Sequence, residues 1–145
     1  MVHVTRTFTV DQPVEFVVDY LADFSHAEAW DPGTQSCTRT DGDGPIAVGA
    51  TWHNVSKVLG RETELTYRLE TLEPGHVVLK GSNKTATSTD DIVVAATSGG
   101  GSEITYTADI ELNGAAKLAA PVMKIEMERL GTKTEEQIKD VFSKL

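Results

Sequence analysis

Hydrophobic and polar residues alternate along most of the first 112 positions, which is the pattern of β-strands with one buried face. Positions 2–10 are rich in Val, Thr and Phe and predict the first strand. Between positions 61 and 72, Leu65, Tyr67 and Leu69 alternate with polar neighbours, as in a half-buried antiparallel strand. The same pattern, bounded by turn residues, predicts six strands after the first: 34–40, 50–59, 61–72, 77–81, 86–97 and 104–112.

A helical period interrupts the alternation after the first strand. Apolar residues stand at positions 14, 17, 18 and 21, which form one face of a helix. Pro13 suits a first helical turn, and Asp11 or Gln12 is expected to cap it. A second short helical segment is predicted over 24–30, because Pro32 and Gly33 end it.

The C-terminal segment 115–145 is rich in Ala, Met, Glu, Lys and Leu and predicts one long amphipathic helix. Pro121 marks either the true first turn of this helix or a kink. Gly131 lowers helix propensity, so we expect it to permit a close packing contact. The apolar face is formed by Ala119, Met123, Met127, Leu130, Thr134, Ile138, Val141 and Leu145.

The order of elements predicts an α+β fold over one domain, residues 1–145. A curved seven-stranded antiparallel sheet has one face to bury, and the long C-terminal helix is the only large element that can cover it. The expected order is β-α-α-β6-α, with the short helices closing one end. A sheet that curls around one helix leaves space between the two, so an internal cavity is expected.

The segment ADFSHAEAWDP at positions 22–32, directly after the first helix, carries a family resemblance together with this element order. The whole chain resembles the START-like or Bet v 1-like (SRPBCC) superfamily, and most of all its bacterial polyketide cyclase/dehydrase and lipid-transport group. The resemblance implies a helix-grip fold with a deep apolar cavity that holds lipids, sterols or polyketides. It implies no metal and no cofactor, and it is specific for the fold rather than for any reaction.

Charge narrows the range of partners. The chain has 22 acidic and 13 basic residues, a net charge of −9, and no cluster of Lys and Arg. This balance argues against nucleic acid and against an anionic membrane surface. No apolar run is long enough to span a membrane, no signal peptide is evident, and Cys37 stands alone, so we expect a cytoplasmic protein.

The usual catalytic and metal motifs are not found. The four histidines are scattered, and the calcium-loop-like stretch at 41–52 has Ile46 in place of the turn glycine and Trp52 in place of the final glutamate. No G-x-S-x-G motif is present, and Cys37 has no histidine nearby in sequence. We therefore predict no metal site and assign no catalytic residue.

Two groups of side chains are candidates for the cavity. Proton transfer to a carbonyl or hydroxyl group needs a residue such as His53, Tyr67, Arg68 or Tyr106, all on strands expected to line or flank it. By alternation, however, His53 faces away from Trp52. The predicted ligand-binding residues are mainly apolar: Trp30, Trp52, Tyr67, Leu69, Tyr106, Met123 and Met127.

Three hypotheses about function follow. The first is binding or transport of a hydrophobic small molecule, such as a lipid or polyketide, between the sheet and the C-terminal helix. The second is a cofactor-independent polyketide cyclase or dehydratase that acts by proton transfer in the same cavity. The third is an interaction module that uses the long helix as a partner surface. The sequence leaves monomer and homodimer open.

Overall fold

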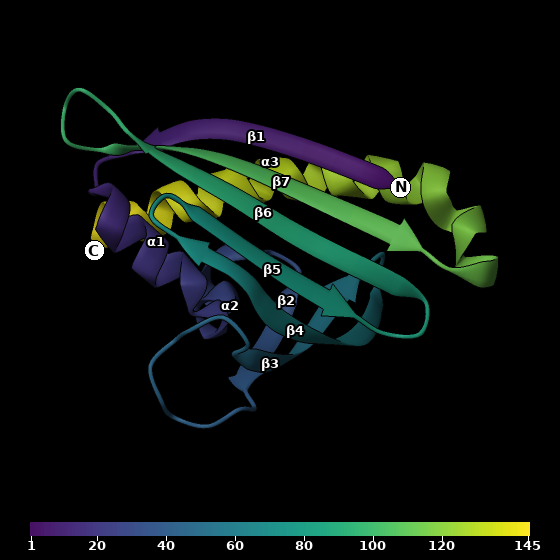
Figure 1. The fold of residues 1–145 in the computed structure, drawn as a ribbon. Helices are drawn as coiled ribbons and strands as arrows, with labels where there is room; N and C mark the ends of the chain where they lie inside the picture. The colour runs from purple at the N-terminus through teal and green to yellow at the C-terminus, as the bar shows by residue number, and fades with distance from the viewer.

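The computed structural model describes residues 1–145 and has the predicted α+β helix-grip architecture (Figure 1). Each predicted strand and helix is present, in the predicted order. The elements are β1 Val2–Val10, α1 Val14–Ala22, the 3-10 turn η1 Phe24–His26, α2 Ala27–Trp30, β2 Thr34–Arg39, β3 Thr51–Val58, β4 Arg61–Glu73, β5 His76–Ser82, β6 Ala86–Ala96, β7 Ser102–Leu112, the 3-10 turn η2 Gly114–Ala119 and α3 Ala120–Lys144.

All seven strands form one antiparallel sheet in the order β1-β7-β6-β5-β4-β3-β2. From β2 to β7 each strand pairs with the next along the chain, and β1 closes the other edge by pairing with β7. Register shifts between Thr34 and Ser36 in β2 and between Leu69 and Thr71 in β4 interrupt the ladder. Such irregularities bend strands, and the sheet curves around one face along which α3 runs (Figure 1).

Helix α3 is shorter than the predicted segment because its first part is the 3-10 turn η2. Pro121 lies in the first turn of α3, where its missing N–H costs no hydrogen bond, so it starts the helix and does not kink it. Gly131 makes the expected close contact. A Cβ atom there would lie 3.0 Å from Cγ2 of Val4, so the absence of a side chain lets α3 approach β1.

The first helix is capped differently from our prediction. Pro13 itself is the N-cap of α1, and no side chain makes a capping hydrogen bond there. Gln12 instead donates to the carbonyl oxygens of Phe142 (3.3 Å) and Leu145 (2.8 Å) at the end of α3. The prediction for Gln12 was wrong because the fold brings two distant chain segments together, and free carbonyl groups at a helix end need donors.

Helices α1 and α2 close one end of the space between sheet and α3. Phe24 lies at the centre of an aromatic cluster there, with its ring centroid 5.9 Å from Trp30, 6.2 Å from Trp52 and 4.3 Å from Tyr67. Phe24, Trp30 and Trp52 are at most 1% exposed. Aromatic side chains therefore fill this end of the molecule, and the cavity described below lies further along α3.

Candidate functional site: a cavity between the sheet and α3

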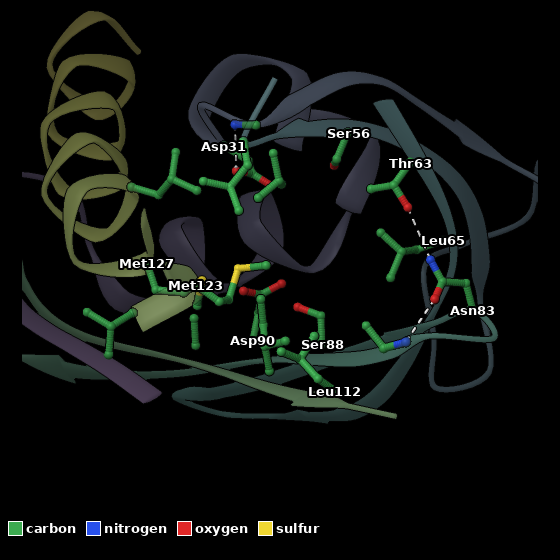
Figure 2. A pocket seen from close by; sticks show the side chains of 18 of the residues that line it. Asp31, Ser56, Thr63, Leu65, Asn83, Ser88, Asp90, Leu112, Met123 and Met127 are labelled. Atoms are coloured by element: carbon green, nitrogen blue, oxygen red, sulfur yellow. Dashed lines mark hydrogen bonds between the residues drawn. The ribbon is translucent and has the colours of Figure 1, made fainter. Parts of the chain in front are cut away.

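A cavity of ≈320 Å³ lies between the inner face of the sheet and α3. Most of its lining residues are apolar, and Met123 and Met127 of α3 point into it opposite the strands (Figure 2). Met123 is half-buried and Met127 is buried. The volume lies in the range of small-molecule sites, about 300–1,000 Å³, and the flexible thioethers can adapt to irregular ligands.

The structure brings four of the seven predicted ligand-binding residues to this cavity: Tyr67, Tyr106, Met123 and Met127. The other three, Trp30, Trp52 and Leu69, do not line it and are at most 1% exposed in the core. Alternation correctly puts Trp52 and Leu69 on the inner face, but that face is longer than the cavity. Trp30 packs behind the wall, with its ring centroid 6.1 Å from that of Tyr106.

Two of the residues considered for proton transfer lie on the outer face of the sheet. His53 is exposed and its Nε2 lies 3.0 Å from Glu64, whereas Arg68 is exposed and pairs with Glu70. Neither side chain reaches the cavity, because odd and even positions of a strand point to opposite faces. Of the four, only Tyr67 and Tyr106 face inward.

Asp90 of β6 is the polar residue of this site that our sequence analysis missed. Its side chain lines the cavity, the residue is only 5% exposed, and the Tyr106 hydroxyl donates a hydrogen bond to Oδ1 at 2.5 Å. The signal was present in the sequence. Asp90 shares its strand face with Ile92 and Val94, both buried, so alternation alone places an acid among core positions.

The pKa of Asp90 is raised to about 7, mainly by burial. The negative charge of Asp31 contributes to this rise, and the hydrogen bond from Tyr106 partly opposes it. Burial likewise raises the pKa of Tyr106 well above its usual value, and the charge of Asp90 adds to this effect. Near neutral pH, the pair therefore combines a neutral phenol with a carboxyl group that can hold or release a proton.

Asp31 supplies a second carboxyl group to the cavity. It follows α2, and its oxygens accept hydrogen bonds from the backbone N–H of Gly33 (3.1 Å) and the hydroxyl of Thr34 (2.9 Å). These bonds form the turn that leads into β2, and Asp31 is the C-cap of α2. Burial raises the pKa of Asp31, and both hydrogen bonds partly oppose this shift.

Tyr67 reaches across the sheet because Gly81 opposite it has no side chain. A Cβ atom at Gly81 would lie 2.4 Å from the Tyr67 ring, so the ring lies directly on the β5 backbone. Burial raises the pKa of Tyr67 well above its usual value, as does the charge of Asp90, while a hydrogen bond with Ser88 of β6 lowers it. Tyr67, Ser88, Asp90 and Tyr106 thus form one polar stretch on an otherwise apolar wall.

The far side of the cavity is bounded by two turns. Asn83 Nδ2 donates to Thr63 Oγ1 at 3.2 Å (Figure 2). It also donates to the Glu64 carbonyl oxygen at 3.0 Å, and the two bonds tie the β5–β6 turn to β4. At the β3–β4 turn, the backbone N–H of Leu59 donates to Oε2 of Glu126 at 3.2 Å, which joins this turn to α3.

The site contains no obvious place for a metal ion, since no group of three or more His, Cys, Asp and Glu side chains is arranged to hold one. Cys37 is buried, and burial raises the pKa of its thiol to about 12, so the thiolate nucleophile is disfavoured. The groups available for chemistry are therefore the carboxyl groups of Asp31 and Asp90 and the hydroxyl groups around them.

The curved sheet, the long helix and the cavity between them define a helix-grip protein. The chain belongs to the family described as "Polyketide cyclase / dehydrase and lipid transport", whose profile matches residues 1–141. No curated protein sequence matches the chain. No helix combines the length and apolar character needed to cross a membrane.

Solved structures support the fold. A START superfamily protein from Mycobacterium smegmatis is 10% identical with a TM-score of 0.80, covering 98% of this chain and 97% of its own. The ZhuI aromatase/cyclase from Streptomyces sp. R1128 is 14% identical with a TM-score of 0.79, covering 97% and 93%. A protein from Thermus thermophilus is 14% identical with a TM-score of 0.71, covering 94% and 96%.

Proposed function

We propose that the protein binds a hydrophobic small molecule, such as a lipid or polyketide, in the cavity between the sheet and α3. The observation that carries this proposal is a mostly apolar cavity of ≈320 Å³ with its polar groups gathered in a few places. Apolar walls supply affinity, and a few polar groups orient the ligand. The family description, which includes lipid transport, supports the same function.

Binding of the neutral dye Nile red tests this proposal. We expect its emission to rise with protein, and a neutral lipid or an aromatic polyketide to displace it. Met123→Trp should weaken binding about tenfold or more, because a larger side chain at this lining position fills the cavity. Ile125→Trp is the matched control, since Ile125 is 73% exposed on the same helix and does not line the cavity.

A protein that leaves the dye dark at high concentration contradicts the proposal. So does an equal loss of binding in the Met123 and Ile125 variants, because the dye would then bind somewhere other than the cavity. Native mass spectrometry of the purified protein adds an independent measurement, since a retained ligand appears as a defined increase in mass.

A cyclase- or dehydratase-type enzyme is the second candidate function. The Asp90–Tyr106 pair favours it, because a carboxyl group with a pKa near 7 can both donate and accept a proton at neutral pH. Cyclisation and dehydration need proton transfer at a carbonyl or hydroxyl group, and Asp90 can carry that proton while Tyr106 holds its Oδ1 through a hydrogen bond. The aromatase/cyclase with the same fold shows that this architecture can house such an enzyme.

Asp90→Asn and Tyr106→Phe separate the two candidates once a turned-over substrate is known. General acid–base catalysis contributes about 10²–10⁴-fold, so Asp90→Asn should lower kcat by at least about 10²-fold while substrate still binds. Tyr106→Phe should lower kcat less. Full activity in both variants would rule out catalysis by this pair.

A further inference from the structure

The cavity holds a carboxyl group that is not fully satisfied by the protein. Asp90 is only 5% exposed, and its side chain points into the cavity (Figure 2). Oδ1 accepts the hydrogen bond from Tyr106, but no protein group donates to Oδ2. Oδ2 therefore has no protein partner but stays open to the cavity, where a bound molecule can donate a hydrogen bond to it.

No positive charge compensates Asp90. Asp31 lies on the opposite side of the cavity (Figure 2) and adds negative charge, which raises the pKa of Asp90. Neither carboxyl group forms an ion pair with a protein cation, and Arg61 is the only basic residue in the lining. Arg61 is exposed at the start of β4. The interior of the cavity is thus acidic as well as apolar.

We infer that the ligand is a hydrophobic amine, an apolar molecule with a single protonated amino group. This ammonium group binds the carboxyl group of Asp90, and Asp31 adds further negative charge to the same cavity. The inference rests on the proposed function, because it names the chemical class of the molecule bound there. An ammonium group supplies both the missing donor for Oδ2 and the missing positive charge. The methionines of α3 then contact the apolar body of the ligand.

Other ligand chemistries fit this interior less well. The carboxylate of a fatty acid meets like charge at Asp90 and finds its only cation at the exposed Arg61. A ketone offers only an acceptor, so it can bond to Asp90 only while that carboxyl group is protonated. An alcohol can donate to Oδ2 but leaves the charge uncompensated.

Binding of an ammonium group requires the charged form of Asp90, so affinity for the amine should change with pH in a defined direction. The titratable groups around Asp90 are Asp31, Tyr67 and Tyr106, whereas α3 contributes only uncharged residues to the lining. An alkylamine stays protonated to about pH 10, like lysine. Affinity for the amine should therefore rise by about tenfold between pH 6 and pH 8 as Asp90 ionises, and level off above that.

Displacement of Nile red by four ten-carbon probes provides the test: decylamine, decanol, decanone and decanoate, each used below its micelle concentration. The chains are equal in length, so differences report the head group alone. We expect decylamine to bind about tenfold or more tighter than decanol at pH 8. Decanoate should bind weakest.

Asp90→Asn isolates the carboxyl group, because asparagine can still accept the Tyr106 hydrogen bond. The variant should lose the preference for decylamine and its pH dependence, while decanol binds as before. Asp91→Asn is the matched control, since it removes the same charge from the next position of β6, on the outer face beside His76. Its preference for decylamine should be unchanged.

The possible outcomes distinguish failure of the proposed function from failure of the amine inference. If no probe binds and Nile red stays dark, the proposed function fails. If the probes bind but decanol, decanone or decanoate equals or exceeds decylamine at pH 8, binding stands and the amine inference is overturned. If Asp90→Asn does not fold, the pH series of the unaltered protein still decides, because affinity for decylamine that is flat from pH 6 to pH 8 overturns it.

Discussion

Asp90 supplies a carboxyl group to the cavity and lowers the stability of the fold by doing so. A carboxyl group placed among Ile92 and Val94 loses its hydration when the strand joins the sheet, and one hydrogen bond from Tyr106 does not replace it. A valine at this position would suit the core better. Apart from accepting the hydrogen bond of Tyr106, Asp90 contacts no polar group of the protein through its side chain, which lines the cavity.

The pH dependence of unfolding measures this cost. The pKa of Asp90 is about 7 in the folded chain against 3.8 ordinarily, so between pH 4 and pH 7 the folded state keeps a proton that the unfolded chain releases. The free energy of unfolding therefore falls as pH rises through this window, by up to about 4 kcal/mol. In Asp90→Asn this contribution should be missing, so the variant gains stability relative to the unaltered protein as pH rises.

Urea unfolding at pH 4, 5.5 and 8 gives the comparison. Asp43→Asn serves as the control, because Asp43 is exposed in the loop between β2 and β3 and forms no ion pair. Identical pH profiles for the unaltered protein and Asp90→Asn would show that Asp90 carries no buried charge.

Gly81 is the second residue on which the site depends. Because the Tyr67 ring occupies the space where a Cβ atom would lie, Gly81→Ala must push that ring away from β5. We expect a loss of about 1–3 kcal/mol in the free energy of unfolding and weaker Nile red binding, since the displaced ring enters the cavity. Gly44→Ala should change neither quantity, because nothing lies within 4 Å of its added Cβ.

At the scale of elements, the β3–β4 turn and α3 enclose the cavity between them. The turn reaches α3 through one hydrogen bond, from the Leu59 N–H to Glu126, and Arg129 Nε holds that carboxylate from 2.7 Å away. The hydrogen bond from Arg129 is the main reason that the pKa of Glu126 is lowered, so the carboxylate is charged at neutral pH. Leu59 has a φ of 54°, a left-handed conformation that costs energy outside glycine.

Loss of the hydrogen bond between Leu59 and Glu126 should speed ligand exchange. We expect Glu126→Ala to raise the dissociation rate of Nile red roughly fivefold, the effect of about 1 kcal/mol for one hydrogen bond, with little change in the far-ultraviolet circular dichroism spectrum. Stopped-flow displacement measures the rate. Glu136→Ala is the control, because Glu136 is exposed on the same helix and makes no ion pair, and an equal rate in both variants would exclude a gating role for the turn.

At the scale of the whole molecule, the cavity borders the hydrophobic core, since Val4, Tyr67, Tyr106, Ala108 and Met127 belong to both. Its walls come from the sheet and from α3, and the same two elements form most of that core. A ligand that binds only the folded state must therefore stabilise the whole fold.

A thermal or urea unfolding series with ligand tests this coupling. At a free ligand concentration about one hundred times Kd, the free energy of unfolding should rise by about 2.7 kcal/mol. The shift should appear equally in tryptophan fluorescence and in circular dichroism, because Trp30 and Trp52 are buried in the core that closes one end. A ligand that binds without shifting the unfolding midpoint would contradict a site that exists only in the folded protein.

The sequence by itself determined the secondary structure and which face of each strand is buried. Periods of two and of three to four residues report local geometry, so the strands, the short helices and the outward direction of His53 follow from position alone. Asp90 was also readable in this way, as an acid on the face that carries Ile92 and Val94. The alternation does not show, however, that this acid lines a cavity.

Only the tertiary structure decided which inward-facing residues meet the cavity and which fill the core. Alternation treats Leu69 and Tyr67 alike, but Phe24 and Trp30 fill the space at one end, and Gly81 lets the Tyr67 ring lie on the neighbouring strand. The pairing of Asp90 with Tyr106 and the placement of Asp31 opposite both depend on elements far apart in the chain. Sequence periodicity reports the direction of a side chain, whereas the space in front of it depends on the packing of the other elements.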